Sequence, residues 1–100
     1  MKESVLQKSI IDYCKKNHIY CVNIHGGGWC AKGVPDLLLC VNGRFVALEL
    51  KVKNNAPQDD QLIHKSRILV SGGIWSCPRN LADAVSVIED VRNGKSIYHT

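Results

Sequence analysis

The chain has 100 residues, of which 45% are hydrophobic and 22% are charged. This composition is typical of one small globular domain, which we expect to span residues 1–100. No apolar run approaches the roughly 18 residues of a membrane-spanning helix, and the first residues do not resemble a secretion signal. We therefore expect no membrane association and a cytoplasmic location. The formal net charge of +4 allows an anionic partner such as nucleic acid without requiring one.

The five cysteines favour reduced thiols over a disulfide or zinc framework. Their number is odd, and the sequence contains no Cys-x-x-Cys pair. Four of them lie inside apolar segments, where we expect free cysteines to be buried as small hydrophobic residues. These four are Cys14, Cys21, Cys40 and Cys77. The pattern fits a reducing compartment.

The first third of the chain predicts a helix, a strand and a loop. Apolar residues recur at helical spacing over residues 4–17, namely Leu6, Ile10, Tyr13 and Cys14. Residues 19–24 are rich in β-forming residues and predict a strand. Residues 25–33 contain four of the eight glycines, which predicts a loop.

The clearest local pattern is a β-hairpin. Asn42-Gly43 favours a two-residue type I′ turn, and it is flanked by two apolar runs, residues 36–41 and 44–51. Counting outward from this turn places Asp36 directly opposite Glu49, with Cβ atoms about 5 Å apart. A shift of the register by one residue would place the two acids on opposite faces of the sheet, so the pairing depends on this turn.

The remainder of the chain predicts a helix, a short strand and a final helix. Residues 59–71 show helical spacing through Leu62, Ile63, Ile68 and Leu69. Gly72-Gly73 ends this helix, and residues 74–77 form a strand that Pro78 stops. Asn80 caps the last helix, which ends at Gly94. The predicted order is α-β-β-β-α-β-α, an α/β fold in which helices flank a mixed sheet.

The hairpin brings two carboxylates and an amine together. Lys51 is two residues beyond Glu49 and therefore on the same face. Opposed acids destabilise a sheet, but a hard cation such as Mg²⁺ or Mn²⁺ between them reverses that effect. Such an ion promotes phosphodiester hydrolysis, in which Lys51 would orient or deprotonate water or neutralise developing charge. The alternative is structural, with Lys51 pairing with Glu49 or Asp36 at a hydrated sheet edge.

These residues also carry a family resemblance. Gly33-Val34-Pro35-Asp36 followed by Glu49-Leu50-Lys51 resembles the PD-(D/E)xK nuclease signature. The whole chain resembles the small stand-alone VRR-NUC domain, which implies a restriction-endonuclease-like core. The resemblance extends to Glu3 near the start, the glycine-rich loop, Gln61 ten residues after Lys51, the Gly72-Gly73 break, and the final strand and helix. The chain lacks the Val-Arg-Arg string that names the family.

The resemblance implies a role for each matching residue. The implied ligands of Mg²⁺ or Mn²⁺ are Asp36, Glu49 and the backbone carbonyl of Leu50. Lys51 is the implied catalytic lysine, Glu3 is implied to reach a water molecule on the metal, and Gln61 is implied to lie beside the lysine. The alternatives are a solvated acid favoured by the helix dipole for Glu3 and an exposed first-turn residue for Gln61.

The implied activity is that of a DNA endonuclease, acting as a homodimer on branched DNA such as a Holliday junction. Further candidates for substrate contact are Trp29, Lys32, Lys53 and Arg79. The alternative for Trp29 is an incidental tryptophan in a loop, and the alternative for the cations is an ordinary solvated surface. Two other functions remain open for the whole chain: a nucleic-acid-binding module without catalysis, and a structural or partner-binding domain.

Overall fold

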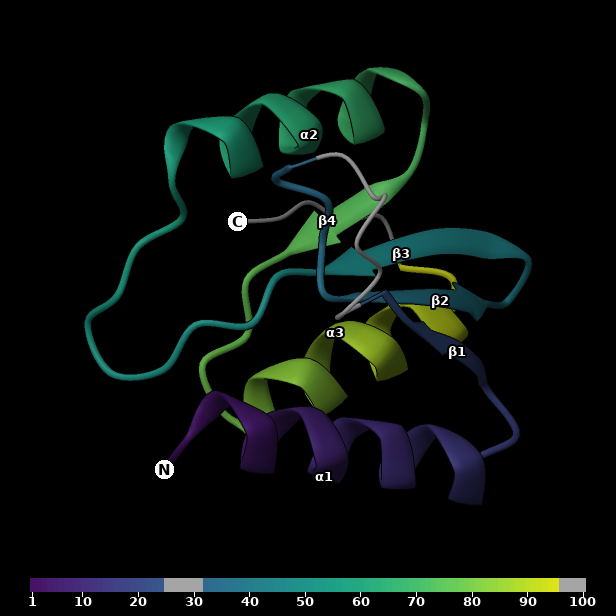
Figure 1. Ribbon diagram of the computed structural model, residues 1–100. Coiled ribbons are helices and arrows are strands. Elements are labelled where there is room, and N and C mark those ends of the chain that lie inside the picture. The colour runs from purple at the N-terminus through teal and green to yellow at the C-terminus, as the bar shows by residue number, and fades with distance from the viewer. Residues whose placement is uncertain (25–31, 96–100) are drawn as a thin grey trace.

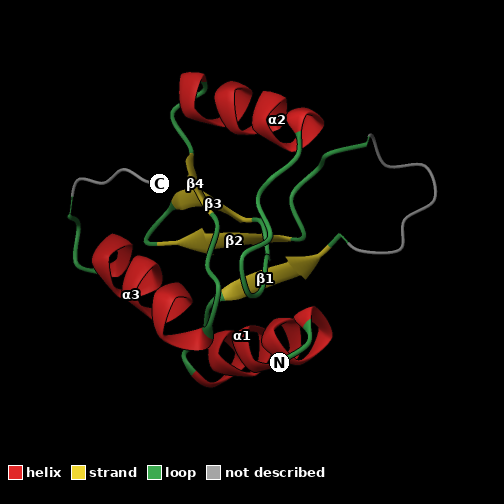
Figure 2. Ribbon diagram, turned by 90° about the vertical axis from the view of Figure 1, so that its left-hand side faces the viewer, coloured by secondary structure: helices red, strands yellow, loops and turns green. Residues whose placement is uncertain are grey.

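A computed structural model describes residues 1–24 and 32–95 of the chain. Its elements are α1 (Glu3–Lys16), β1 (Tyr20–Asn23), β2 (Leu37–Val41), β3 (Arg44–Leu48), α2 (Asp59–Val70), β4 (Ile74–Ser76) and α3 (Leu81–Arg92). Figure 1 and Figure 2 show three layers, in which α1 and α3 cover one face of the sheet and α2 lies over the other. The predicted α/β fold and its element order are therefore confirmed.

The four strands form one mixed sheet in the order β1-β2-β3-β4. The β1–β2 and β2–β3 pairs are antiparallel, and β4 runs parallel to β3 after the crossover through α2. The hairpin turn is the predicted one, because Asn42 and Gly43 have φ angles of 52° and 75°, as a type I′ turn requires. Val41 consequently pairs with Arg44, and the register continues to Leu37 opposite Leu48.

The main core lies between the sheet and the α1–α3 layer. Helix α1 contributes Leu6, Ile10 and Cys14, helix α3 contributes Ala84, Ile88 and Val91, and the sheet contributes Leu37, Leu39, Val41, Val46 and Leu48. Alternation along β2 explains this set, since every second side chain faces the two helices. Asn80 caps α3 by accepting the backbone N–H of Asp83 at 2.8 Å, as its sequence predicts.

Helix α2 differs from its sequence pattern, because none of its residues is fully buried. Leu62, Ile63 and Leu69 are 41%, 59% and 44% exposed. Figure 1 shows α2 above the β3–β4 side of the sheet. Its apolar residues are spread around too much of the helix for one sheet face to cover them all.

The expectation of buried thiols is correct only in part. Cys14 is buried and Cys21 and Cys77 are half-buried, but Cys40 is exposed. All four are free, and Cys30 lies outside the described residues. Cys40 points away from the α1–α3 core because its neighbours Leu39 and Val41 point toward it. Within the described ranges, no helix is long and apolar enough to cross a membrane.

Candidate active site

Two acidic side chains meet where the hairpin ladder ends. Leu37 and Leu48 form its last pair, so Asp36 and Glu49 are the next residues on the two strands. The charge of Asp36 acts on the carboxyl group of Glu49, so the two acids lie close together. Asp36 Oδ2 also accepts the backbone N–H of Leu50 at 2.8 Å. The acids therefore come together as the hairpin register predicts, and the backbone fixes one of them.

Glu49 is an unusual carboxyl group because it is only 2% exposed. Its Oε1 atom is buried and has no hydrogen-bond partner among the described residues. Burial raises the pKa of Glu49 to about 8, and the nearby charge of Asp36 acts in the same direction. The charge of Glu3 raises this pKa further, whereas the charge of Lys51 lowers it. These effects place Glu3, Asp36 and Lys51 in the surroundings of Glu49.

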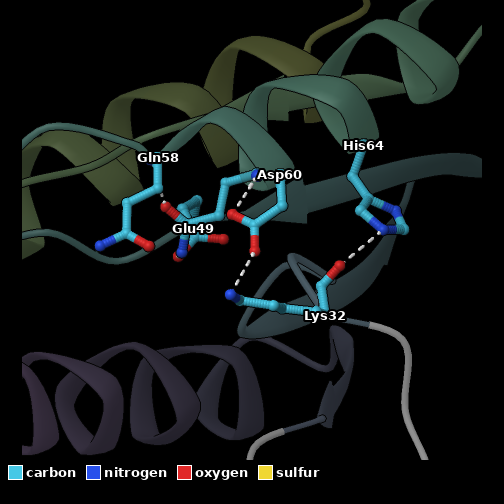
Figure 3. Close-up of polar contacts among 6 residues, drawn as sticks. Lys32, Glu49, Gln58, Asp60 and His64 are labelled. Carbon is cyan, nitrogen blue, oxygen red and sulfur yellow. Dashed lines mark hydrogen bonds and ion pairs between the residues drawn. The ribbon is translucent and has the colours of Figure 1, made fainter.

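Gln61 supplies the partner for the other oxygen of Glu49. Its Nε2 atom donates to Glu49 Oε2 at 2.8 Å, and its Oε1 atom accepts the backbone N–H of Gln58 at 2.8 Å. The second bond belongs to a capping box at the start of α2, and Figure 3 shows Glu49 lying beneath this first turn. Gln61 therefore links the helix start to the acid, a contact that its sequence position alone did not reveal.

Glu3 reaches the same region from the first turn of α1. It lines a cavity of about 230 Å³ together with Ser4, Gln7, Asp36 and Leu50. Ser4 and Gln7 were not predicted as site residues. The signal available in the sequence was spacing, because Gln7 is four residues after Glu3 and lies on the same side of the helix. Gln7 is held by Asn23, whose Oδ1 atom accepts its Nε2 at 2.8 Å.

The site fits a hard divalent cation. A buried carboxylate oxygen without a partner and a second carboxylate beside it are oxygen ligands of the kind that Mg²⁺ and Mn²⁺ prefer. Across the described part of the chain, no three His, Cys, Asp or Glu side chains form a ready metal cluster. Mg²⁺ does not need one, because it keeps several water ligands and binds through one or two carboxylates. The carboxylates of Asp36 and Glu49 therefore suit such an ion.

Lys32 lies beside the first turn of α2, where its exposed side chain is close to an acid. Its Nζ atom is 3.8 Å from Asp60 Oδ2, and its backbone carbonyl is 3.1 Å from His64 Nε2 (Figure 3). Gly33 makes this approach possible. Its φ angle is +88°, and a Cβ atom there would lie 2.6 Å from the backbone oxygen of Asp60.

The side chain of Arg79 is hydrogen-bonded to the backbone of Lys53. The guanidinium Nη1 of Arg79 donates to the carbonyl of Lys53 at 3.3 Å and also to the carbonyl of Asn55. Lys53 itself is exposed and has a φ angle of +57°. Arg79 thus holds the turn that follows the acidic centre. Trp29, the remaining candidate, lies outside the described residues.

Cys77 is influenced by the charges of both Arg79 and the two acids. Burial raises the pKa of this thiol, and four surrounding charges also act on it. Arg79 and Lys51 lower the pKa, whereas Glu49 and Asp36 raise it. The sequence indicated only an apolar position for Cys77. Its location near the site follows from β4, where the carbonyl of the preceding residue, Ser76, accepts the N–H of Glu49 at 2.9 Å.

Comparison with known proteins supports the fold. No protein-family model and no curated protein matches the chain. A solved structure described as "VRR_NUC domain" is similar, with a TM-score of 0.73 and 22% sequence identity. The match covers 87% of this chain and 94% of that structure. The chain therefore has the fold of a VRR_NUC domain, as the sequence resemblance implied.

Proposed function

We propose that the chain is a divalent-metal-dependent DNA endonuclease that hydrolyses phosphodiester bonds. The observation that carries the proposal is the Glu49 carboxyl group, which is buried near Asp36 and has one oxygen without a partner among the described residues. Leaving a polar atom in this state costs roughly 1–3 kcal/mol, and a bound cation would remove that cost. The VRR_NUC fold supports the assignment to a nuclease.

The ligands of Mg²⁺ or Mn²⁺ would be Asp36, Glu49 and the backbone carbonyl of Leu50. Such an ion supplies Lewis acidity, which makes water more acidic and stabilises charge on the phosphate in the transition state. No additional protein ligands are required, because water molecules complete the coordination of these hard ions. The backbone N–H of Leu50 keeps Asp36 in position during this binding.

Three other residues act around this centre. The Lys51 amine would stabilise the negative charge that develops on the reacting phosphate or orient the attacking water. Glu3 lines the adjoining cavity and would hold that water by accepting a hydrogen bond. Gln61 acts by positioning, because its amide fixes Glu49 Oε2.

The proposed substrate is branched DNA, and the proposed assembly is a homodimer. Two centres related by a two-fold axis would cut paired strands of a symmetric junction. Lys32, Lys53 and Arg79 would add phosphate contacts, which would make binding dependent on salt. Trp29 remains a candidate for base stacking.

A substrate panel tests the proposal. Labelled four-way junction, duplex and single-stranded DNA are incubated with Mg²⁺, Mn²⁺ or chelator, and the solution mass is measured by light scattering. We expect metal-dependent cutting of the junction and a mass of twice 11.1 kDa. The matched pair of variants is Glu49→Gln, which should not cut, and Asp12→Asn, which alters an exposed carboxylate on α1 and should cut normally. DNA binding without metal-dependent cutting would instead identify a binding module.

A further inference from the structure

A second cavity lies beside the acidic centre and presents cations. Its volume is about 360 Å³, and its walls are formed by Pro57, Leu62, Lys65, Trp75, Cys77 and Arg79. Two of these six residues carry a positive charge and none carries a carboxylate. A hollow with this composition favours an anion over a cation or a neutral ligand.

Both cations are held in place without being neutralised. The guanidinium of Arg79 donates to the backbone carbonyls of Lys53 and Asn55, which orient it but carry no net charge. Lys65 Nζ lies 4.8 Å from the centre of the Trp75 ring, and Trp75 is only 2% exposed. Within residues 1–24 and 32–95, neither cation forms an ion pair with a carboxylate. Their charges are therefore available to a ligand and already ordered for it.

The cavity is connected to the acidic centre through the chain that leaves β4. Ser76 binds the backbone N–H of Glu49, Cys77 is a wall of the cavity, and Arg79 follows two residues later. Cys77 therefore follows directly after a backbone contact with the acidic centre and also lines the cavity. A strand that crosses the acidic centre can therefore place a neighbouring group in the cavity.

We propose that this cavity binds a phosphate group of the nucleic-acid strand, adjacent to the phosphodiester positioned at Asp36 and Glu49. Lys65 and Arg79 are its binding residues, and the apolar wall formed by Pro57 and Leu62 faces the attached sugar. The inference rests on the proposed function, since it assumes that DNA is the ligand of the neighbouring centre. It adds a fixed second contact, which sets the direction in which the strand crosses the site.

A scan with neutral linkages tests the inference by binding alone. A set of fluorescent junction DNAs is prepared, each with one uncharged methylphosphonate linkage at a different position. The affinity of each is measured with Ca²⁺ in place of Mg²⁺, so that the readout is binding and not cleavage. One linkage position should weaken binding to the wild-type protein about tenfold, as expected for a lost charged hydrogen bond. In Lys65→Gln the penalty at that same position should be clearly smaller, because one of the two residues that bind the phosphate is already absent.

Matched variants and DNA ends complete the design. Lys15→Gln removes an exposed cation from α1 and should preserve the full tenfold penalty. Arg79→Gln should reduce the penalty as Lys65→Gln does. Because Arg79 also holds the 53–55 turn, its fold is checked by circular dichroism and Lys65→Gln remains the deciding variant. Comparing the affinities of DNA with and without a 5′-monophosphate shows whether the cavity binds an internal phosphate or a terminal one.

The outcomes are distinguishable from those for the proposed function. A penalty that is equal in wild type and folded Lys65→Gln at every position overturns the phosphate cavity, whether or not the protein cuts DNA. A protein that shows the predicted coupling but never cuts supports the cavity and contradicts the nuclease. Wild-type protein that binds no DNA contradicts both.

Discussion

Gln61 and Glu49 form a hydrogen bond of 2.8 Å that connects the first turn of α2 to the acid at the end of β3. The same glutamine side chain forms part of the capping box with Gln58. Its amide nitrogen therefore donates to Glu49 while its amide oxygen accepts from the backbone of Gln58. An amide in this position can satisfy Glu49 whether or not the acid carries a proton on its other oxygen. This arrangement makes Glu49 a suitable position for testing electrostatics without disturbing shape.

Glu49→Gln should raise stability without metal while abolishing function. The substitution keeps an acceptor for Gln61 and replaces a carboxyl group, whose charged form is disfavoured by burial and by Asp36, with a neutral amide. We expect a gain of about 1 kcal/mol in the free energy of unfolding, measured by urea denaturation with chelator. The variant should also lose the rise in melting temperature that Mn²⁺ produces in wild type. A mutant that cuts DNA at the wild-type rate would remove Glu49 from the site.

The metal-free protein should become less stable as the pH rises from about 4.5 to about 8. The pKa of Glu49 is raised from its ordinary 4.5 to about 8, so the folded state holds this proton more tightly than the unfolded state. Unfolding then releases a proton in this window, and the free energy of unfolding falls with increasing pH. Chemical denaturation of wild type and Glu49→Gln across the window measures the effect. Equal slopes for the two proteins would contradict the assignment to Glu49.

Lys51→Ala should separate metal binding from turnover. The amine is not among the proposed ligands, so the thermal shift with Mn²⁺ should remain. Cutting should fall by at least about a hundredfold, as expected when a charge that stabilises the transition state is removed. Single-turnover cleavage with saturating protein measures the rate, and Lys15→Ala on α1 is the control. Loss of the Mn²⁺ shift together with activity would instead give Lys51 a structural role.

Gly33→Ala should destabilise the fold more than Gly43→Ala. Both glycines have positive φ angles, of 88° and 75°, so each substitution incurs the cost of the left-handed conformation, about 1–2 kcal/mol. Only at Gly33 would the new Cβ also meet backbone, at 2.6 Å from the oxygen of Asp60. Overpacking should add roughly 1–3 kcal/mol. Urea denaturation of the two variants compares these costs, and equal losses would show that Gly33 is not in close contact with α2.

The hairpin was the part of the site that the sequence could predict. Asn42-Gly43 specifies a turn with two positive φ angles, and the alternation of strand residues then determines which side chains share a face. Asp36 and Glu49 could therefore be paired from local information. The burial of Glu49 could not, because it depends on α2 and β4, which are distant in sequence.

The packing of α2 and the surroundings of β4 required the structure. Helical spacing predicted an apolar face on α2, but how much of it the sheet covers depends on where the helix crosses. Cys77 and Lys65 approach each other from different elements, so spacing along the chain held no sign of the cavity between them.

The double role of Gln61 has a dynamic consequence. If the first turn of α2 frays, the capping bond to Gln58 and the bond to Glu49 are lost by the same side-chain movement. Helix ends are ordinarily among the segments that open most readily. Here, opening would release a carboxylate oxygen, so occupancy of the acidic centre and hydrogen-exchange protection of that turn are thermodynamically coupled.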